Sequence, residues 1–226
     1  MDLTGSPSDG AGRAVDTRIG QLCATCVRDT SVDGGGVSVL SSDGVPVLLH
    51  ATDPVSRAIE DLQFTLGEGP CVEASLAGTP ILVSDLNDPA EGVSGRWPVF
   101  MSEARKVGVR AVFAFPIRTG AIALGTVDLY RNKPGPLTND QLASGLRTVD
   151  AIGARLLGAE SLDPVAETTY PMTVHQAAGM VMTQTGSSIE EALVRMRAHA
   201  YAEGVSVADL ATDVVQGRRR FFKEDL

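Results

Sequence analysis

The residues best suited to chemistry in this chain are its three cysteines, Cys23, Cys26 and Cys71. The Cys-x-x-Cys spacing of the first two is found in redox and metal-binding pairs, but no second pair or nearby histidine completes a zinc site. An odd number of cysteines also argues against a disulfide framework. Free cysteine packs well as a small hydrophobic residue, and an apolar helical stripe runs through Val15, Ile19, Leu22, Cys23, Cys26 and Val27. We therefore predict a structural role for the pair and no metal site.

Candidate catalytic residues are scarce. Histidine occurs only as His50, His175 and His199. No Gly-x-Ser-x-Gly nucleophile turn and no phosphate-binding Gly-x-x-x-x-Gly-Lys loop is present. The acid pair Glu190-Glu191 is explained by the positive end of a helix. We expect no catalytic residues and no enzymatic activity.

One cluster of basic residues occurs, in the segment Arg218-Arg-Arg-Phe-Phe-Lys223. It either holds phosphates or forms a tail that tucks Phe221 and Phe222 onto the preceding helices, and the sequence favours neither. Residues 173–223 carry a net charge of only +1. Because phosphate contacts drive non-specific affinity, any nucleic-acid binding must be site-specific, dimer-assisted or weak.

Composition indicates a soluble protein of one or two domains. The chain has 226 residues and a formal net charge of −9. No apolar run approaches the ~18–20 residues that span a bilayer. Residues 1–12 are rich in Gly, Ser and Asp and lack the apolar core of a signal peptide. We expect a cytoplasmic location.

Three short helices are predicted between residues 173 and 217, each with its own start and stop signals. A Ser or Thr followed three residues later by Gln, Glu or Asp caps a helix start. The candidate N-caps are Thr173, Ser187 and Ser206. Glycine adopts the left-handed conformation that ends a helix, and the candidate stops are Gly186, Gly204 and Gly217. So small a unit buries little apolar surface, and we expect it to pack on the rest of the chain or on a second copy.

The order and spacing of several residues in this segment match a known module. They are Gln176-Ala-Ala-Gly-Met180, Met182, Glu191-Ala192, Arg197, Ala200, Leu210-Ala211 and Val214-Val215. On these residues the segment resembles the ANTAR domain, an RNA-binding antitermination module of bacterial signalling proteins. The family usually has Lys where Ala178 stands, and we expect this departure to remove a positive charge from an RNA-facing edge.

The resemblance implies an RNA-binding surface on the first two helices and the basic tail. A glycine at 179 permits close approach of another backbone, and Tyr201 is placed to stack on an unpaired base. Solvent-exposed edges of a helical bundle explain each of these residues about as well. The candidate RNA-binding residues are His175, Gly179, Arg195, Arg197, Tyr201, Arg218 and Arg219.

A three-helix DNA-binding module is the rival interpretation, in which the last helix would enter the major groove. The exposed face of that helix carries Asp209 and Asp213 and has no basic residue before Arg218. Acids on that face would repel phosphates. We therefore expect no DNA binding.

Residues 13–160 are predicted to form an α+β sandwich in which helices flank one central antiparallel sheet. The segment Asp33-Gly-Gly-Gly36 is predicted to be a turn. The predicted elements are helix 13–30, strands 37–40 and 45–50, helices 53–62 and 70–76, strand 81–83, helix 99–107, strands 111–117 and 123–130, and helix 139–158. Residues 161–172 contain Pro164 and Pro171 and are predicted to be a linker.

A second set of motifs follows this order of elements. They are Leu66-Gly-Glu-Gly-Pro-Cys71, Gly78-x-Pro80, Asp85-Leu86, Arg96-Trp97-Pro98, Ala104, Gly108-Val109, Pro116, Gly125 and Leu129-Tyr130. On these residues the N-terminal part resembles the GAF domain, a small-molecule-sensing fold, and in particular the GAF domains that precede ANTAR modules in actinobacterial proteins. The resemblance implies domains at 13–160 (GAF) and 173–222 (ANTAR), joined by the linker.

GAF pockets lie between the sheet and its covering helices, so the resemblance implies a candidate ligand-binding site. Its candidate residues are Cys71, Trp97, Phe113, Phe115 and Tyr130. Ordinary packing in the core explains each of them as well. We expect no cofactor, and the sequence names no small-molecule effector.

Taken together, the two resemblances imply a cytoplasmic, signal-responsive regulator. Its C-terminal module would bind paired hexaloop stem-loops in nascent RNA and prevent a terminator from forming. Two stem-loops require two copies of the module, so we expect a homodimer. The alternative is a sensory or scaffolding protein whose ANTAR module acts through protein contacts without binding RNA.

Overall fold

The computed structural model describes residues 8–40, 46–158 and 169–223. The chain divides into two compact units. The first contains the described strands and helices α1 to α5 apart from the end of α2, and the second contains residues 64–67 and helices α6 to α8. The predicted combination of an α+β sandwich and a small three-helix bundle is confirmed.

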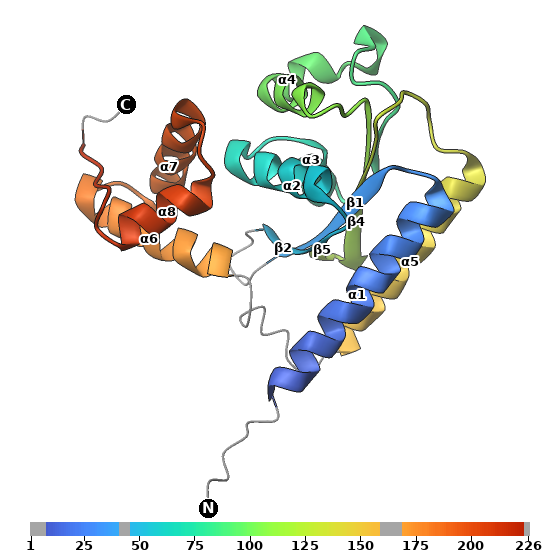
Figure 1. The fold of residues 1–226 in the computed structure, drawn as a ribbon, viewed down its shortest axis with the longest axis horizontal. Coiled ribbons are helices and arrows are strands. Elements are labelled where there is room, and N and C mark those ends of the chain that lie inside the picture. Colours follow the sequence, from blue (N-terminus) through green and yellow to red (C-terminus); the bar gives the residue numbers. More distant parts are fainter. Residues whose placement is uncertain (1–7, 41–45, 159–168, 224–226) are drawn as a thin grey trace, which may run out of the picture. The chain divides into compact units, whose positions relative to one another are not determined.

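A five-stranded antiparallel sheet forms the centre of the N-terminal unit (Figure 1). Its strand order is β2-β1-β5-β4-β3. The strands are β1 (Gly34–Leu40), β2 (Pro46–Ala51), β3 (Ile81–Val83), β4 (Ala111–Thr119) and β5 (Ile122–Arg131). The predicted hairpin is confirmed by the pairing of β1 with β2, and residues 41–45 between them lie outside the described residues.

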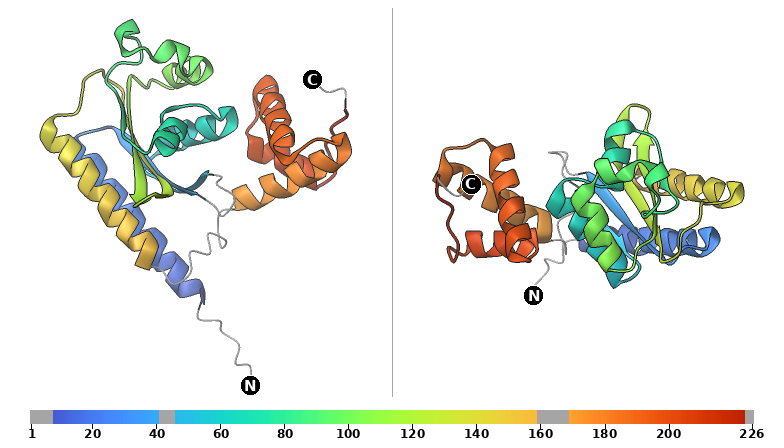
Figure 2. Two further views of the ribbon diagram at one scale, coloured as in Figure 1. Left: turned by 180° about the vertical axis from the view of Figure 1, so that it is seen from behind. Right: turned by 90° about the horizontal axis from the view of Figure 1, so that it is seen from above.

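Helices cover both faces of this sheet (Figures 1 and 2). Two of them, α1 (Ser8–Thr30) and α5 (Asn139–Gly158), pack on one face. The opposite face is covered by α2 (Pro54–Leu66) and α3 (Pro70–Ala77), with α4 (Pro98–Lys106) beyond them. Two short 3₁₀ turns, Pro89–Glu91 and Val93–Gly95, precede α4.

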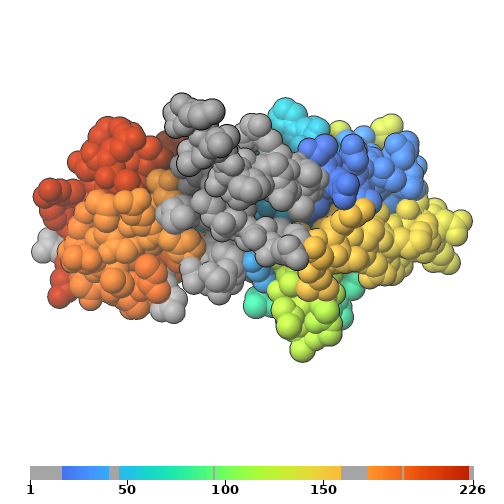
Figure 3. Space-filling view, turned by 90° about the horizontal axis from the view of Figure 1, so that it is seen from below, coloured from blue at the N-terminus to red at the C-terminus, as the bar shows by residue number. Residues whose placement is uncertain are grey.

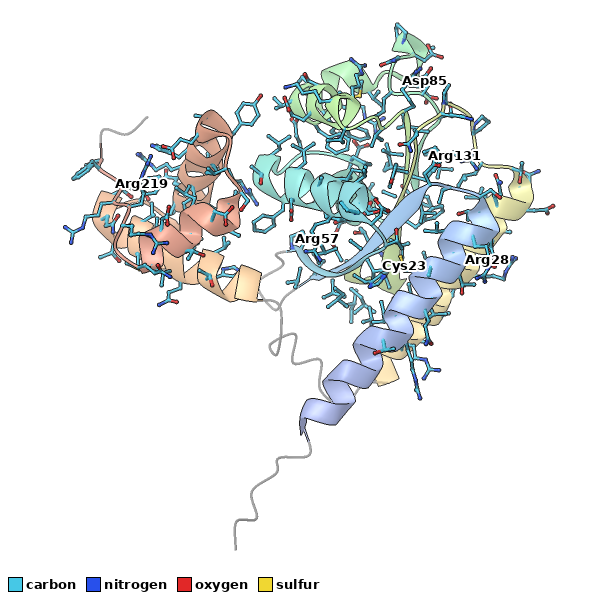
Figure 4. All side chains as sticks on the ribbon, viewed as in Figure 1. Cys23, Arg28, Arg57, Asp85, Arg131 and Arg219 are labelled. Carbon is cyan, nitrogen blue, oxygen red and sulfur yellow. The ribbon has the colours of Figure 1, made fainter. Side chains whose placement is uncertain are left out.

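The apolar core lies between the sheet and the pair α1–α5, which run side by side (Figure 3). Cys23 and Cys26 are fully buried in this core, and Cys23 points from α1 toward the sheet (Figure 4). Burial raises the pKa of the Cys23 thiol to about 12, and a thiol that stays protonated is a poor nucleophile. The predicted structural role of the pair is confirmed.

The glycines after Asp33 are part of strand β1, so the prediction of a turn there was wrong. Gly34 to Gly36 pair with residues 128–130 of β5. A Cβ atom on Gly34 would lie 2.0 Å from Asp53 Oδ2 and 2.6 Å from the Tyr130 ring. The glycines therefore serve close packing under α2, a tertiary demand that outweighs their preference for turns.

Helix α2 begins with Asp53 as its N-cap. Oδ1 of Asp53 accepts hydrogen bonds from the backbone N–H groups of Val55 (2.8 Å) and Ser56 (2.9 Å). It also accepts one from the Tyr130 hydroxyl at 3.0 Å, which ties the helix to strand β5. Partial burial alone would raise the pKa of this carboxyl, but hydrogen bonds from Ser56, Thr52 and Tyr130 hold it below its usual value.

The C-terminal unit consists of α6 (Thr169–Thr185), α7 (Ile189–Glu203) and α8 (Val207–Val215). Ser206 caps α8, and Gly186 and Gly204 adopt the left-handed conformation, as predicted. The predicted cap Ser187 was wrong. Ser188, with Glu191, forms the capping box of α7, since the adjacent serines offer the same chemistry one residue apart.

Helix α6 begins at Thr169, so its start at the predicted cap Thr173 was wrong. Pro171 is tolerated because the first N–H groups of a helix have no intrahelical partner. Residues 161–168 of the predicted linker lie outside the described residues. In the described part of the chain, no helix is long and apolar enough to cross a membrane.

Gly125→Ala is expected to destabilise the N-terminal unit by about 1–3 kcal/mol or more, the cost of overpacking a core. The new Cβ would lie 2.0 Å from the backbone oxygen of Ser38 on the adjacent strand. Urea unfolding followed by fluorescence of Trp97, the single tryptophan, measures the change. Gly158→Ala is the control, because a Cβ there meets nothing within 4 Å. Equal stability of the two variants would contradict this packing.

Asp53→Ala is expected to cost about 1 kcal/mol at pH 7, the usual loss for an N-cap. Asp53→Asn keeps a capping oxygen and isolates the effect of charge. Because the folded-state pKa is lowered, the carboxylate stabilises fully above the unfolded value of about 3.9, and this advantage is lost as the pH falls through the folded value. Wild type should thus exceed Asp53→Asn in stability at pH 7, with the difference shrinking at pH 3. A constant difference would contradict the assignment.

Candidate functional site

The three helices of the C-terminal unit pack through small side chains. The residues on their inner faces are fully or almost fully buried: Val174, Ala177, Ala178, Val181, Ala192, Met196, Ala200, Val207, Leu210, Ala211 and Val214. Alanines at these positions bring the backbones close together. This core fixes which side chains of α6 and α7 are presented to solvent.

Ala178 belongs to this core and has no exposed surface. The expectation that Ala178 removes a charge from an RNA-facing edge was therefore wrong, because the position is not an open edge in this chain. Its neighbour Gly179 is partly exposed, and a Cβ built there meets nothing within 4 Å. The open position on α6 is thus the glycine.

The predicted RNA-binding residues of α6 and α7 lie around the rim of the core. Tyr201 exposes 49% of its surface at the C-terminal end of α7. Arg195 is half-buried, and its Nε and Nη1 atoms have no hydrogen-bond partner among the described residues. The His199 ring bonds through Nδ1 to the carbonyl of Arg195, one helical turn earlier, at 3.1 Å. His175 is half-buried, and its Nε2 likewise has no hydrogen-bond partner among the described residues.

The basic tail is folded back onto the bundle. Phe221 is buried beside His199, with ring centroids 4.7 Å apart, and its N–H donates to Gln184 Oε1 at 2.9 Å. Phe222 is 64% exposed. The sequence left open whether this tail binds phosphates or packs Phe221 and Phe222 onto the helices. In the structure Phe221 packs onto the helices and Phe222 does not.

Two of the tail arginines are paired with acids. Arg218 bonds through Nε to Asp213 Oδ1 at 2.8 Å, and Arg219, labelled in Figure 4, pairs with Glu203. Arg220 and Lys223 are exposed, and no ion pair joins them to another described residue. The cationic groups open to a polyanion are therefore Arg220 and Lys223 more than the predicted Arg218 and Arg219.

In the N-terminal unit, the five predicted ligand-binding residues do not meet at one place. Phe113 and Phe115 belong to the apolar core on the α1–α5 side of the sheet. Cys71 and Tyr130 lie on the opposite side, where they bond to Thr126 and Asp53 respectively. Trp97 precedes α4, and its indole N–H donates to Glu73 at 3.0 Å.

A small cavity lies between the sheet and helix α2. It has room for about one water molecule and is bordered by Gly35, Gly36, Ser56, Ile59, Glu60, Gln63, Pro70, Val112, Phe113, Asp128, Leu129 and Tyr130. Pockets for drug-sized ligands are far larger, about 300–1,000 Å³. This cavity therefore has no space for an organic effector of that size.

Buried polar side chains gather beside this cavity. Ser38 donates to Glu60 Oε2 at 2.7 Å, and Thr126 donates to Asp128 Oδ2 at 3.0 Å. Cys71 Sγ lies 3.0 Å from Thr126 Oγ1. Since the single hydroxyl hydrogen of Thr126 goes to Asp128, the thiol of Cys71 is the donor in that contact.

Burial changes the protonation of this cluster. It raises the pKa of Asp128 to about 6 and that of Glu60 well above its usual value, in each case because a buried carboxylate loses its hydration. Burial, followed by the nearby acids, likewise raises the pKa of the Cys71 thiol. Lys or Arg side chains form no ion pair with these acids among the described residues.

Glu60 and Asp128 are the functional candidates that sequence reasoning missed. Glu60 follows Ile59 inside an amphipathic helix and resembles an ordinary solvent-facing acid. The available signal was the alternation on β5, where Thr126 and Asp128 share one face of an otherwise apolar strand. Polar residues on a buried strand face indicate either a network or a site.

Comparison with known proteins agrees with this division of the chain. The GAF domain model matches residues 15–156, more than half of the chain, and the ANTAR domain model matches residues 172–215. GAF domains sense signals, and ANTAR domains are RNA-binding antitermination modules. The search of curated proteins gives no match.

Solved structures share the fold of the N-terminal unit. One is the GAF domain region of a protein described as a membrane protein from Geobacter sulfurreducens PCA, with a TM-score of 0.56 and 13% identity, covering 67% of this chain and 99% of that one. Another is a domain of a protein described as a two-component sensor histidine kinase from Sinorhizobium meliloti 1021, with a TM-score of 0.50 and 14% identity, covering 64% and 92%. The chain belongs to the GAF domain family and carries an ANTAR domain after its GAF domain.

Proposed function

We propose that this protein is a signal-responsive RNA-binding regulator that promotes transcription antitermination by binding stem-loops in nascent RNA. The observation that carries the proposal is the ANTAR match over residues 172–215, on a bundle that presents the exposed side chains of Tyr201, Arg220 and Lys223. Nascent RNA is the target, so the protein acts in the cytoplasm. Neither matched domain is a catalytic type, and we propose no enzymatic activity.

RNA recognition in this proposal depends on stacking more than on charge. Bases of single-stranded loops stack on exposed aromatic rings, and Tyr201 offers such a ring at the end of α7. Positive charge open to the RNA comes from Arg220 and Lys223, whose side chains are exposed, whereas Nε and Nη1 of Arg195 are buried. Arg218 and Arg219 contribute less to phosphate binding, because each is in an ion pair that RNA would have to break.

Two stem-loops held together require two copies of the module, and the proposed protein is a homodimer. Leu146 and Leu157 of α5 support this, because they are 43% and 56% exposed. Their spacing of three helical turns places them on one face of the helix. A second copy would remove these side chains from water.

The ion pairs of the basic tail favour a second candidate, a scaffold that acts through protein contacts. Arg218–Asp213 and Arg219–Glu203 neutralise half of the charge that the tail would offer to phosphates. Binding to RNA and its dependence on Tyr201 separate the two candidates.

Tyr201→Ala is expected to weaken binding to an RNA with two hexanucleotide-loop stem-loops by about 5- to 150-fold, which corresponds to 1–3 kcal/mol per stacked base. Tyr201→Phe is the matched control and should bind like wild type, because it keeps the ring. Fluorescence anisotropy at moderate salt measures the dissociation constants. Binding equal to that of a scrambled RNA, or equal affinity of Tyr201→Ala and wild type, would refute the proposed surface.

Leu157→Glu is expected to convert the dimer to a monomer in sedimentation-velocity measurements, since it places a charge in the proposed apolar contact. Leu76→Glu changes a leucine of α3 that is 83% exposed and should leave the dimer intact. A monomeric wild type, or dissociation by both variants, would count against α5 as the contact.

A further inference from the structure

We infer that Glu60, Asp128 and Cys71 form a binding site for one divalent transition-metal ion of the zinc class. One potential ligand atom from each residue lies within 4.8 Å of the other two, and all three residues are buried. Carboxylate oxygen and thiolate sulfur both ligate Zn²⁺. This inference stands on the N-terminal unit alone and is independent of RNA binding.

Hydroxyl groups donate to one oxygen of each carboxyl group and leave the other oxygen of each without a hydroxyl donor. Ser38 satisfies Glu60 Oε2 and Thr126 satisfies Asp128 Oδ2. Glu60 Oε1 and Asp128 Oδ1 accept no hydrogen bond from a hydroxyl or N–H group of the described residues, and the two carboxyl groups lie within hydrogen-bonding reach of each other. The exposed fractions of these side chains are only 6% and 7%. Outer hydroxyls that fix one oxygen and free the other are the arrangement expected around ligating carboxylates.

The negative charge of the two buried carboxyl groups also favours a bound cation. A buried carboxylate without a counter-charge costs several kcal/mol, and no described ion pair provides one for these two acids. A single proton shared between the carboxyls would also relieve the repulsion. That alternative gives no role to the cavity of about one water molecule that borders both Glu60 and Asp128.

The donor set selects among metals. Mg²⁺ and Ca²⁺ prefer oxygen ligands only, whereas a thiolate with two carboxylates suits Zn²⁺ and its substitute Co²⁺. Three protein ligands leave one tetrahedral position, which the adjacent space can fill with water. On binding, the proton of the Cys71 thiol and the proton held between the Glu60 and Asp128 carboxyls are both lost to solvent as the sulfur–metal and oxygen–metal bonds form, and Thr126 goes on donating to Asp128.

Cobalt substitution tests the site in the full chain, without a histidine tag and after treatment with a chelator. Wild type should take up one Co²⁺ per chain and show a near-ultraviolet thiolate-to-cobalt charge-transfer band, which Zn²⁺ abolishes by displacement. Cys71→Ser should lose the band. Cys26→Ser is the control and should keep it, because Cys26 lies in the apolar core on the other side of the sheet.

A second variant guards against loss of folding. Glu60→Gln keeps the shape of the side chain and should lower Co²⁺ affinity at least about tenfold, the effect that loss of even an outer partner produces. The matched control is Glu103→Gln, in an exposed pair with Lys106. Circular dichroism confirms that each variant is folded. No charge-transfer band in wild type, or a band unchanged in Cys71→Ser, would overturn the site and leave the carboxyls sharing a proton.

Discussion

Two buried carboxyl groups, those of Glu60 and Asp128, impose the strictest condition on the N-terminal unit. Because burial of charge is costly unless it is paired, the surrounding strands supply hydrogen-bond donors to them: Ser38 from β1 and Thr126 from β5. Cys71 of α3 in turn contacts Thr126. Glycines in β1 let α2 approach the sheet closely enough to bring Glu60 there. On the other face, α1 and α5 supply the apolar core. The sheet thus carries stability on one face and the polar cluster, with its potential for chemistry, on the other.

In the C-terminal unit, small side chains form a tightly packed core between the three helices. The side chains around the edge of this core are the ones exposed for binding in the proposed function. Ala178, Ala192 and Ala200 are fully buried, so the proposed contacts with RNA fall to the outward positions of α6 and α7. Acids of α7 and α8 hold two of the tail arginines. A surface with so little net charge gains little from phosphates in general, which favours recognition of a particular loop through stacking over general affinity for RNA.

Much of this architecture could be predicted from sequence, because periodicity and caps are local signals. The five strands and the helix caps Ser206 and Gly204 are examples. Elsewhere, tertiary packing overrode the local sequence pattern. Three glycines whose sequence suggests a turn lie in strand β1, because α2 packs closely over them. The alternation of side chains along a strand places Phe113 and Phe115 on one face of β4. It does not indicate that this face packs against α1 and α5. Glu60 was missed because a helical acid shows its burial only once the fold is known.

The central claim is that the protein changes the fate of a transcript by holding two stem-loops. Single-round transcription in vitro, through a terminator that overlaps the second of two hexanucleotide-loop stem-loops, tests it most directly. Purified full-length protein should raise the fraction of transcripts that read through the terminator, and a template with scrambled loop sequences should show no increase. Read-through that stays unchanged at saturating protein on both templates would contradict the account.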